Sequence, residues 1–348
     1  MSVTKPKINT MKELSEAIGI SRPTLSRYFQ DPTTVLPSTS EKIKQRLADV
    51  DYVYNFIATR QNRKTTGLIG VIIPHFSDLF FTSLLEAIER SARDFGYTII
   101  TQSSDGNPAL EVEAVLKLRS MNADGAIIAP LGVDGSSDAF ISASEDFPIV
   151  FADSKPSPPV PRSDFVGSDN AQSIGAMVDY LCRTNDAPVF LNMPRLNSNA
   201  LEREEAYLAQ MKKYDAEPKL IETDWASDTW QFEAYGFSVM DDHFTHQRYT
   251  SATILCANDR IAIGAIRAAN KHDLFVQNQG SPNDLRIAGH DDHPLSQYMH
   301  PRITTIAQDI EAIGKDSARL LIERIRGERD DQPVHLLKSA TLKMRESA

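Results

Sequence analysis

Cysteines, long apolar runs and an N-terminal targeting segment are scarce or missing in this sequence. Two cysteines, Cys182 and Cys256, are too few for a disulfide scaffold and indicate buried thiols in a reducing compartment. No apolar run approaches the roughly 18 residues that a transmembrane helix needs. The N-terminus, MSVTKPKINT, lacks the apolar core of a signal peptide. We therefore expect a cytoplasmic protein with no membrane partner.

Motifs of the common enzyme classes are missing as well. The sequence has no nucleophile elbow and no phosphate-binding glycine loop. The segment His290-Asp291-Asp292-His293 resembles a set of metal ligands, and paired aspartates can serve acid–base chemistry. No second cluster has metal-ligand spacing, so we expect no enzymatic activity, no catalytic residue, no metal and no cofactor.

Charge is distributed unevenly along the chain. The 348 residues include 37 Lys and Arg against 47 Asp and Glu, a net charge of −10. Residues 1–66 hold 11 of the basic residues and only six of the acidic ones, so this segment is basic and the remainder is acidic. A basic segment attached to an acidic body indicates a polyanion partner for that segment. The length itself indicates two or three domains.

The stretch from residue 10 to residue 30 predicts two short helices joined by a turn. Thr10 followed by Glu13 is a capping-box signature, so a helix is expected to begin at the next residue. Gly19 can adopt the left-handed conformation that ends a helix. Ser21 is a suitable N-cap for the second helix.

The second helix of this stretch has two faces. Pro23 lies in its first turn, where a missing N–H costs nothing, and Leu25 and Phe29 face the first helix. The side chains left pointing outward are Arg22, Thr24, Ser26 and Arg27. This pattern predicts a helix-turn-helix, and an ordinary helical hairpin is the alternative.

A third helix is expected from Pro37 to about Val50, which makes residues 1–53 an all-α headpiece of a size suited to DNA binding. Residues 54–66 are short and basic. In isolation they would form a marginal helix, and a plain linker is the alternative.

From Gly67 onward, strands alternate with helices, and the pattern begins again at Asn170. This alternation predicts parallel, doubly wound sheets in two lobes with a cleft between them. We expect a core at 67–348, with a strand at 220–223 in the second lobe. The first lobe is expected at about 67–166 and 307–324, and the second at about 167–306 and 325–345.

Polar and aromatic side chains follow the predicted strands, at the edge where ligands of such sheets bind. They are Asp78, Phe80, Asp153, Arg203, Trp225, Asn258, Asp259 and Asp291. Carboxylates, an amide and a guanidinium can hydrogen-bond vicinal hydroxyls, and aromatic rings can cover the apolar face of a pyranose. Alternatively these residues only cap helices and turns, as Asn258 and Asp259 could do before Ile261.

The chain resembles the LacI-type (lactose-repressor) family of bacterial transcriptional regulators over nearly its whole length. The resemblance is carried by MKELSEAIGISRPTLSRYF, DYVYNFIATR, LIGVIIPHFSDLFFTSLLEAIE, CANDRIAIGAI, AGHDD and PRITTIAQD, in this order. It implies a helix-turn-helix head, a hinge helix at 54–66 that forms on operator DNA, and a dimerising two-lobe core like that of a periplasmic sugar-binding protein. The implied function is a repressor controlled by a small neutral sugar or polyol. The alternatives are a cytoplasmic sugar-binding protein and an activator of the same fold.

The resemblance also implies roles for single residues. Arg22, Pro23 and Arg27 fall on base-reading positions. The residues expected at double-stranded operator DNA are Thr10, Ser21, Arg22, Pro23, Thr24, Ser26, Arg27, Asn55, Ala58, Arg60 and Gln61. The residues expected at the effector are Asp78, Phe80, Asp153, Arg203, Trp225, Asn258, Asp291 and Gln308.

Some features of this sequence refine those expectations. Pro23 has no donor, so base reading depends on Arg22 and Arg27. Gln61 replaces the leucine that the family inserts into the minor groove, which predicts a smaller operator bend. The family's C-terminal tetramerisation heptads are absent, so we expect a homodimer. Four aspartates around the cleft against Arg203 predict repulsion of anionic ligands.

Overall fold

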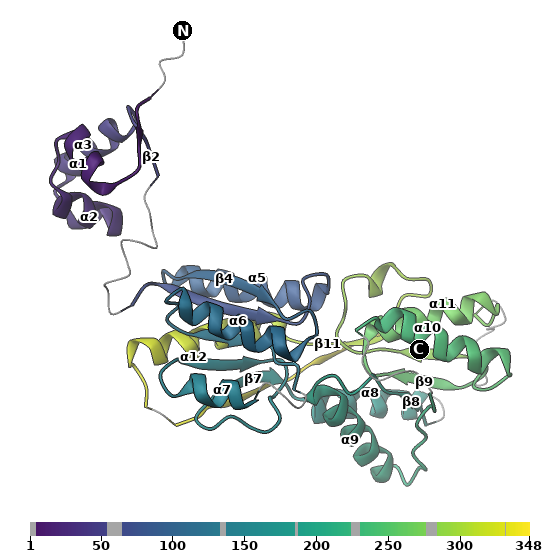
Figure 1. Ribbon diagram of the computed structural model, residues 1–348. Helices are drawn as coiled ribbons and strands as arrows, with labels where there is room; N and C mark the ends of the chain where they lie inside the picture. Colours follow the sequence, from purple (N-terminus) through teal and green to yellow (C-terminus); the bar gives the residue numbers. More distant parts are fainter. Residues whose placement is uncertain are drawn as a thin grey trace. The chain divides into compact units, whose positions relative to one another are not determined.

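The chain folds into two units, Met1–Thr66 and Gly67–Ala348 (Figure 1). The computed structural model describes residues 5–53, 65–132, 137–184, 187–223, 230–275, 284–330 and 332–348. Within these ranges, no helix combines the length and the apolar character needed to cross a membrane.

The first unit is a helical head around a small apolar core of residues such as Leu14, Leu25 and Ile43. Its helices are α1 (Met11–Ile18), α2 (Arg22–Gln30), the 3-10 turn η1 (Pro32–Thr34) and α3 (Pro37–Leu47). The predicted capping box is present, because the Thr10 hydroxyl accepts the Glu13 N–H while the Glu13 carboxylate accepts the Thr10 N–H. One feature was not predicted: β1 (Lys7–Ile8) pairs in parallel with β2 (Asp51–Tyr52).

The turn between α1 and α2 depends on Gly19, whose φ of 60° is left-handed. A Cβ built at this position would lie 3.2 Å from Arg46 Nη1, and this guanidinium donates to the Ile18 carbonyl. We therefore expect Gly19→Ala to destabilise the head by about 1–2 kcal/mol. Hydrogen exchange of the α1 and α2 amides in the full-length protein measures this change.

Gly327→Ala is the matched control, because Gly327 is also left-handed (φ 68°) but ends a helix in the other unit. It is expected to leave exchange in the head unchanged. Equal exchange rates in the head for wild type and Gly19→Ala would contradict the prediction.

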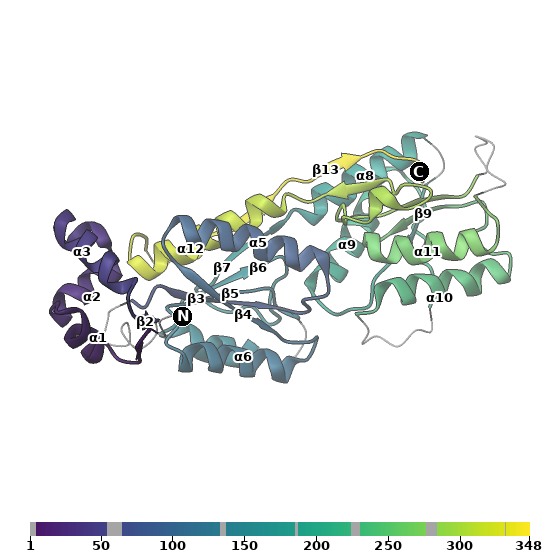
Figure 2. The same cartoon turned by 90° about the horizontal axis from the view of Figure 1, so that it is seen from above.

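The second unit contains two lobes, and the first is built on a six-stranded parallel sheet of order β12-β7-β6-β5-β3-β4. Its strands are β3 (Leu68–Ile73), β4 (Thr98–Ser103), β5 (Ala126–Ile128), β6 (Ile149–Ala152), β7 (Asp164–Ser168) and β12 (His335–Lys338). The helices α5 (Leu79–Asp94) and α12 (Ile310–Arg326) cover one face, and α6 (Pro108–Ser120) covers the other (Figure 2). The helix α7 (Ser137–Ser144) packs on the same face as α6. Successive side chains of β3 point to opposite faces of the sheet: Val71 packs toward α5, and Ile72 packs toward α6.

The second lobe has a three-stranded parallel sheet of order β10-β9-β8. Its elements are α8 (Asn170–Thr184), β8 (Val189–Leu191), α9 (Ser198–Lys213), α10 (Phe232–Thr245), β9 (Thr253–Cys256), α11 (Asp259–Lys271), β10 (Arg286–Ala288) and the 3-10 turn η2 (Ser296–Tyr298). The antiparallel pair β11 (Thr305–Ala307) and β13 (Thr341–Lys343) packs against the same core. The helices α10 and α11 lie side by side (Figure 2).

Two expectations about the core require correction. Residues 325–345 were assigned to the second lobe, but β12 pairs with β7 inside the sheet of the first lobe, so the chain returns to the second lobe only after β12. Residues 220–223 form no strand, because only Leu220 makes a bridge, to Phe190. The parallel, doubly wound architecture in two lobes is confirmed.

Candidate functional site

The head presents the predicted DNA-reading residues on and beside α2. Arg22, Pro23 and Arg27 are exposed, and Thr24 and Ser26 are half-buried. Ser21 caps the helix and its hydroxyl lies 2.8 Å from that of Thr24. Thr10 is exposed at the start of α1 and is also the N-cap of that helix. Two guanidinium groups are therefore available on one helix for contact with a polyanion.

Several predicted site residues lie outside the described residues. They are Asn55, Ala58, Arg60 and Gln61 of the expected hinge helix, and Trp225 of the expected effector site. Their roles stay predictions, as does the smaller operator bend attributed to Gln61.

The other predicted effector residues meet around one cavity between the two lobes. Asp78 and Phe80 come from the start of α5, Asp153 from the end of β6, and the remaining residues from the second lobe and the crossing segments. The lining residues are Asp78, Phe80, Phe81, Asp153, Met193, Asn197, Asn199, Arg203, Trp230, Phe232, Asn258, Arg260, Asp291, His293 and Gln308. Seven predicted residues are therefore close together, although their individual roles stay predictions.

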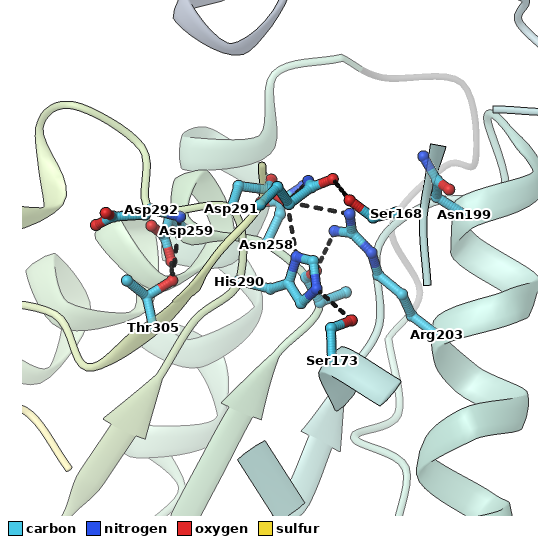
Figure 3. A network of polar contacts seen from close by, with 12 residues as sticks. Ser168, Ser173, Asn199, Arg203, Asn258, Asp259, His290, Asp291, Asp292 and Thr305 are labelled. Carbon is cyan, nitrogen blue, oxygen red and sulfur yellow. Dashed lines mark hydrogen bonds and ion pairs between the residues drawn. The ribbon is translucent and has the colours of Figure 1, made fainter. Parts of the chain in front are cut away.

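Asp291 is the centre of a buried hydrogen-bond network (Figure 3). Its Oδ1 accepts from Arg203 Nη2 at 3.0 Å and from Gln308 Nε2 at 2.7 Å, and it lies 2.7 Å from His290 Nδ1. Gln308 in turn accepts from the Ser168 hydroxyl. The φ of Asp291 is 115°, a conformation that L residues rarely adopt and that is frequent at functional sites.

Arg203 is fixed by three acceptors in addition to its burial. Besides Asp291, its Nη1 donates to the Ala257 carbonyl at 2.7 Å, and its Nε donates to Asn170 Oδ1 at 3.1 Å. Only 3% of the residue is exposed. A guanidinium held in this way offers a rigid set of donors at the edge of the cavity.

Burial changes the protonation of several groups near the cavity. It raises the pKa of Asp153 to about 7, against the opposing charge of Arg203. It lowers the pKa of His290 to about 4, so this imidazole is neutral at pH 7. Burial also raises the pKa of Asp291, but Arg203 and the hydrogen bonds outweigh this effect and the net shift is downward.

Asp259 does not belong to the cavity, which corrects the expected charge balance. The side chain is fully buried and accepts from the hydroxyls of Ser296 and Thr305, each at 2.6 Å. Burial raises its pKa to about 8, and the charge of Asp291 acts in the same direction. The structure therefore does not place four free carboxylates around Arg203, as the sequence predicted.

The histidines and aspartates of residues 290–293 do not converge as ligands would. His290 contacts Asp291 and Ser173, whereas Asp292 pairs with Arg345 at 2.6 Å. The His293 N–H donates to Asp259. In the part of the chain that the structure describes, no group of three His, Cys, Asp or Glu side chains could hold a metal ion.

Several lining residues are not among those predicted from the sequence, above all Trp230 and Arg260. Both follow predicted strands or begin helices of the second lobe, as the chosen residues do, so the same positional signal was available. Trp225 is the tryptophan that the predicted strand at 220–223 and the family resemblance indicate. The structure places Trp230 at the cavity and its ring near Phe81 of the first lobe, with 6.2 Å between centroids.

Because His290 is buried and neutral, we expect the core to lose stability as the pH falls. An unfolded histidine takes up a proton below about pH 6.5, but folded His290 does so only near pH 4. The unfolded state therefore binds more protons between these values. Relative to His290→Gln, the wild type is expected to lose up to about 3 kcal/mol of unfolding free energy as the pH falls from 6.5 to 4.

Urea unfolding at several pH values measures this difference. His246→Gln is the matched control at an exposed histidine, and it is expected to follow the pH dependence of the wild type. A constant stability difference between the wild type and His290→Gln across this range would contradict the prediction.

Comparisons with known proteins agree with this architecture. The family model of a periplasmic binding protein-like domain matches residues 187–348. The HTH-type transcriptional repressor PurR of Vibrio parahaemolyticus is 23% identical over 327 residues, which are 93% of this chain and 94% of PurR. The lac repressor dimer bound to operator and the anti-inducer ONPF has a similar structure, with a TM-score of 0.81, 22% identity and 99% coverage of both chains. The regulator CelR in complex with cellobiose has a TM-score of 0.66 and 20% identity, covering 97% of this chain and 99% of CelR.

A helix-turn-helix head followed by a periplasmic-binding-protein-like core defines a class of transcriptional regulators rather than of enzymes. Within that class, the chain is similar over nearly its whole length to regulators of the LacI type, as its sequence motifs indicated.

Proposed function

We propose that this protein is a transcriptional repressor that binds operator DNA as a homodimer and is controlled by a small neutral sugar or polyol. The proposal rests on one observation: the same chain contains an α2 helix with exposed Arg22 and Arg27 and a two-lobe core that encloses a polar cavity. A cytoplasmic location and the absence of a membrane partner are part of the proposal.

The composition of the cavity supports a polyhydroxylated ligand. Asp153, Asn258 and Arg203 supply acceptors and donors for hydroxyl groups. The aromatic rings of Phe80, Trp230 and Phe232 line the same space and can cover the apolar face of a sugar ring. The complex of the structural neighbour CelR with cellobiose is consistent with a ligand of this kind.

The charges of the cavity support a neutral ligand because its arginines are already paired with carboxylates, and not because of the predicted excess of aspartates. Asp291 is paired with Arg203, and Asp78 is paired with Arg260. An anionic ligand therefore finds both arginines already occupied by carboxylates, and displacing either carboxylate would leave a buried charge without its partner.

A binding experiment with two ligands tests the proposal. The full-length protein is titrated against DNA from upstream of its own gene, and a thermal-shift screen of sugars and polyols identifies a stabilising compound. We expect binding to a near-palindromic site, because a two-fold protein reads two-fold DNA. Affinity is expected to fall by roughly 0.9 log units per neutralised phosphate for each log unit of salt.

The stabilising compound is then added to the DNA complex, and transcription from the site is measured with and without it. Failure to bind DNA would favour a sugar-binding protein, and increased transcription on DNA binding would favour an activator. A sugar phosphate as the tightest ligand would contradict the expectation of a neutral effector.

A further inference from the structure

A second arginine, Arg260, connects the two lobes across the cavity. Its Nη1 donates to Asp78 Oδ2 at 2.8 Å, with Asp78 in the first lobe and Arg260 in the second. Only 6% of the Asp78 side chain and 19% of the Arg260 side chain are exposed. The pair is therefore shielded from the solvent that weakens surface ion pairs.

Each partner of this pair is held in place by its own lobe. Arg260 Nε and Nη2 donate to the Glu233 carboxylate at 2.7 Å each, and the guanidinium lies 5.1 Å from the Phe232 ring centroid. Asp78 Oδ1 accepts the Phe80 N–H at 2.9 Å and so caps α5. If the lobes separate, Arg260 keeps a carboxylate partner and Asp78 keeps its capping bond, so one ion pair breaks while both groups stay oriented to form it again.

The indole of Trp230 lies against the first lobe beside this pair. The Trp230 carbonyl accepts from Arg260 Nη2 at 3.2 Å. A Cβ built on Gly106 of the first lobe would lie 2.7 Å from Trp230 Cδ1, and the ring of His75 has its centroid 5.3 Å from that of Trp230. The environment of Trp230 therefore reports on the distance between the lobes.

The lobes also meet at a second place. Lys155 Nζ lies 2.8 Å from Glu202, and the Lys155 N–H donates to Ser198 Oγ at 2.9 Å. The cavity volume is about 40 Å³, room for about three water molecules. This volume is small for a sugar, so we expect the lobes to move apart or the lining to rearrange when an effector binds.

From this geometry we propose that the Asp78–Arg260 pair is a latch that keeps the cleft closed and must break before an effector enters or leaves. Glu233 serves as the positioning residue that keeps Arg260 aimed at the first lobe. The proposal rests on the proposed function only in treating the cavity as the effector site. Closure of the lobes is testable without an effector.

The experiment uses Trp230 as the reporter in the full-length protein. The sequence contains only two tryptophans, so Trp225→Phe leaves Trp230 as the single source of indole fluorescence. Quenching by acrylamide is compared for this background, for Asp78→Asn and for Arg260→Met. Asparagine can still cap α5, so Asp78→Asn removes the ion pair with little change to the helix. Arg267→Met on the same helix is the matched control, because Arg267 is exposed and lies over Phe237.

Asp78→Asn and Arg260→Met are each expected to increase the open fraction on the order of tenfold and to raise the quenching constant of Trp230. The double variant is expected to match the single variants, because both substitutions break the same pair. Arg267→Met is expected to match the background. The proposal is overturned if Asp78→Asn leaves quenching at the background level, an outcome that does not depend on whether Arg260→Met folds. DNA binding, measured separately, tests the proposed function.

Discussion

Replacing Arg203 with methionine is expected to lower the free energy of unfolding of the core by about 3–5 kcal/mol, the cost of removing one partner of a buried ion pair. Arg203 is 3% exposed and donates to Asp291, to the Ala257 carbonyl and to Asn170. Methionine fills a similar volume but donates nothing. The Asp291 carboxylate, whose side chain is only 18% exposed, then loses its cation, and two further acceptors lose a donor.

Urea unfolding followed by tryptophan fluorescence measures this loss, since both tryptophans fall in the sequence range of the second unit, Gly67–Ala348. Arg248→Met is the matched control, because it removes an exposed pair with Asp242 at 2.8 Å, and a loss below about 1 kcal/mol is expected. Asp291→Asn is expected to be less damaging in the Arg203→Met background than in the wild type, since it removes the unpaired charge. Equal losses for Arg203→Met and Arg248→Met would contradict this account of the network.

Replacing Arg27 with alanine is expected to weaken operator binding by about 1–3 kcal/mol and to relax base preference at one position in each half-site. The expectation follows from the proposed function. Arg27 is exposed on α2, and a guanidinium can donate two parallel hydrogen bonds to a guanine edge. Pro23 also lies on α2 at a predicted base-reading position, but it cannot donate a hydrogen bond. Few groups on α2 can therefore read bases in place of Arg27.

Fluorescence anisotropy with the cognate site and with single-base variants separates loss of specificity from loss of charge. Lys42→Ala is the control, because Lys42 is exposed on α3 and its removal takes one positive charge from the head. It is expected to weaken binding similarly on all sequences. If Arg27→Ala retains wild-type affinity and preference, α2 is not the recognition helix.

The local structure of the head could be read from the sequence because its signals act over a few residues. The Thr10–Glu13 box, the left-handed Gly19 and the Ser21 cap each satisfy backbone groups in their own turn of chain. The same is true of the strand and helix alternation in the core, which follows from side-chain periodicity. Six of the eight residues predicted after the strands line one cavity, because parallel strands end at a common edge.

The pairing between distant segments could not be obtained in this way. Residues 325–345 continue from a helix of the first lobe, and nothing local indicates that β12 pairs with β7. Trp225 and Trp230 follow the same predicted strand, and only the packing against Phe81 and Gly106 places Trp230 at the cavity.

The sequence by itself indicated the resemblance to LacI-type regulators, the two-unit organisation and seven of the fifteen residues that line the cavity. Tertiary structure alone decided the charge state of the cavity: Asp259 is buried away from it, and Asp78 is paired with Arg260, which is 182 residues away in the chain. Ionisation and pairing depend on which groups share a desolvated space, and that space exists only in the folded chain: within the second lobe for Asp259, and between the lobes for Asp78 and Arg260.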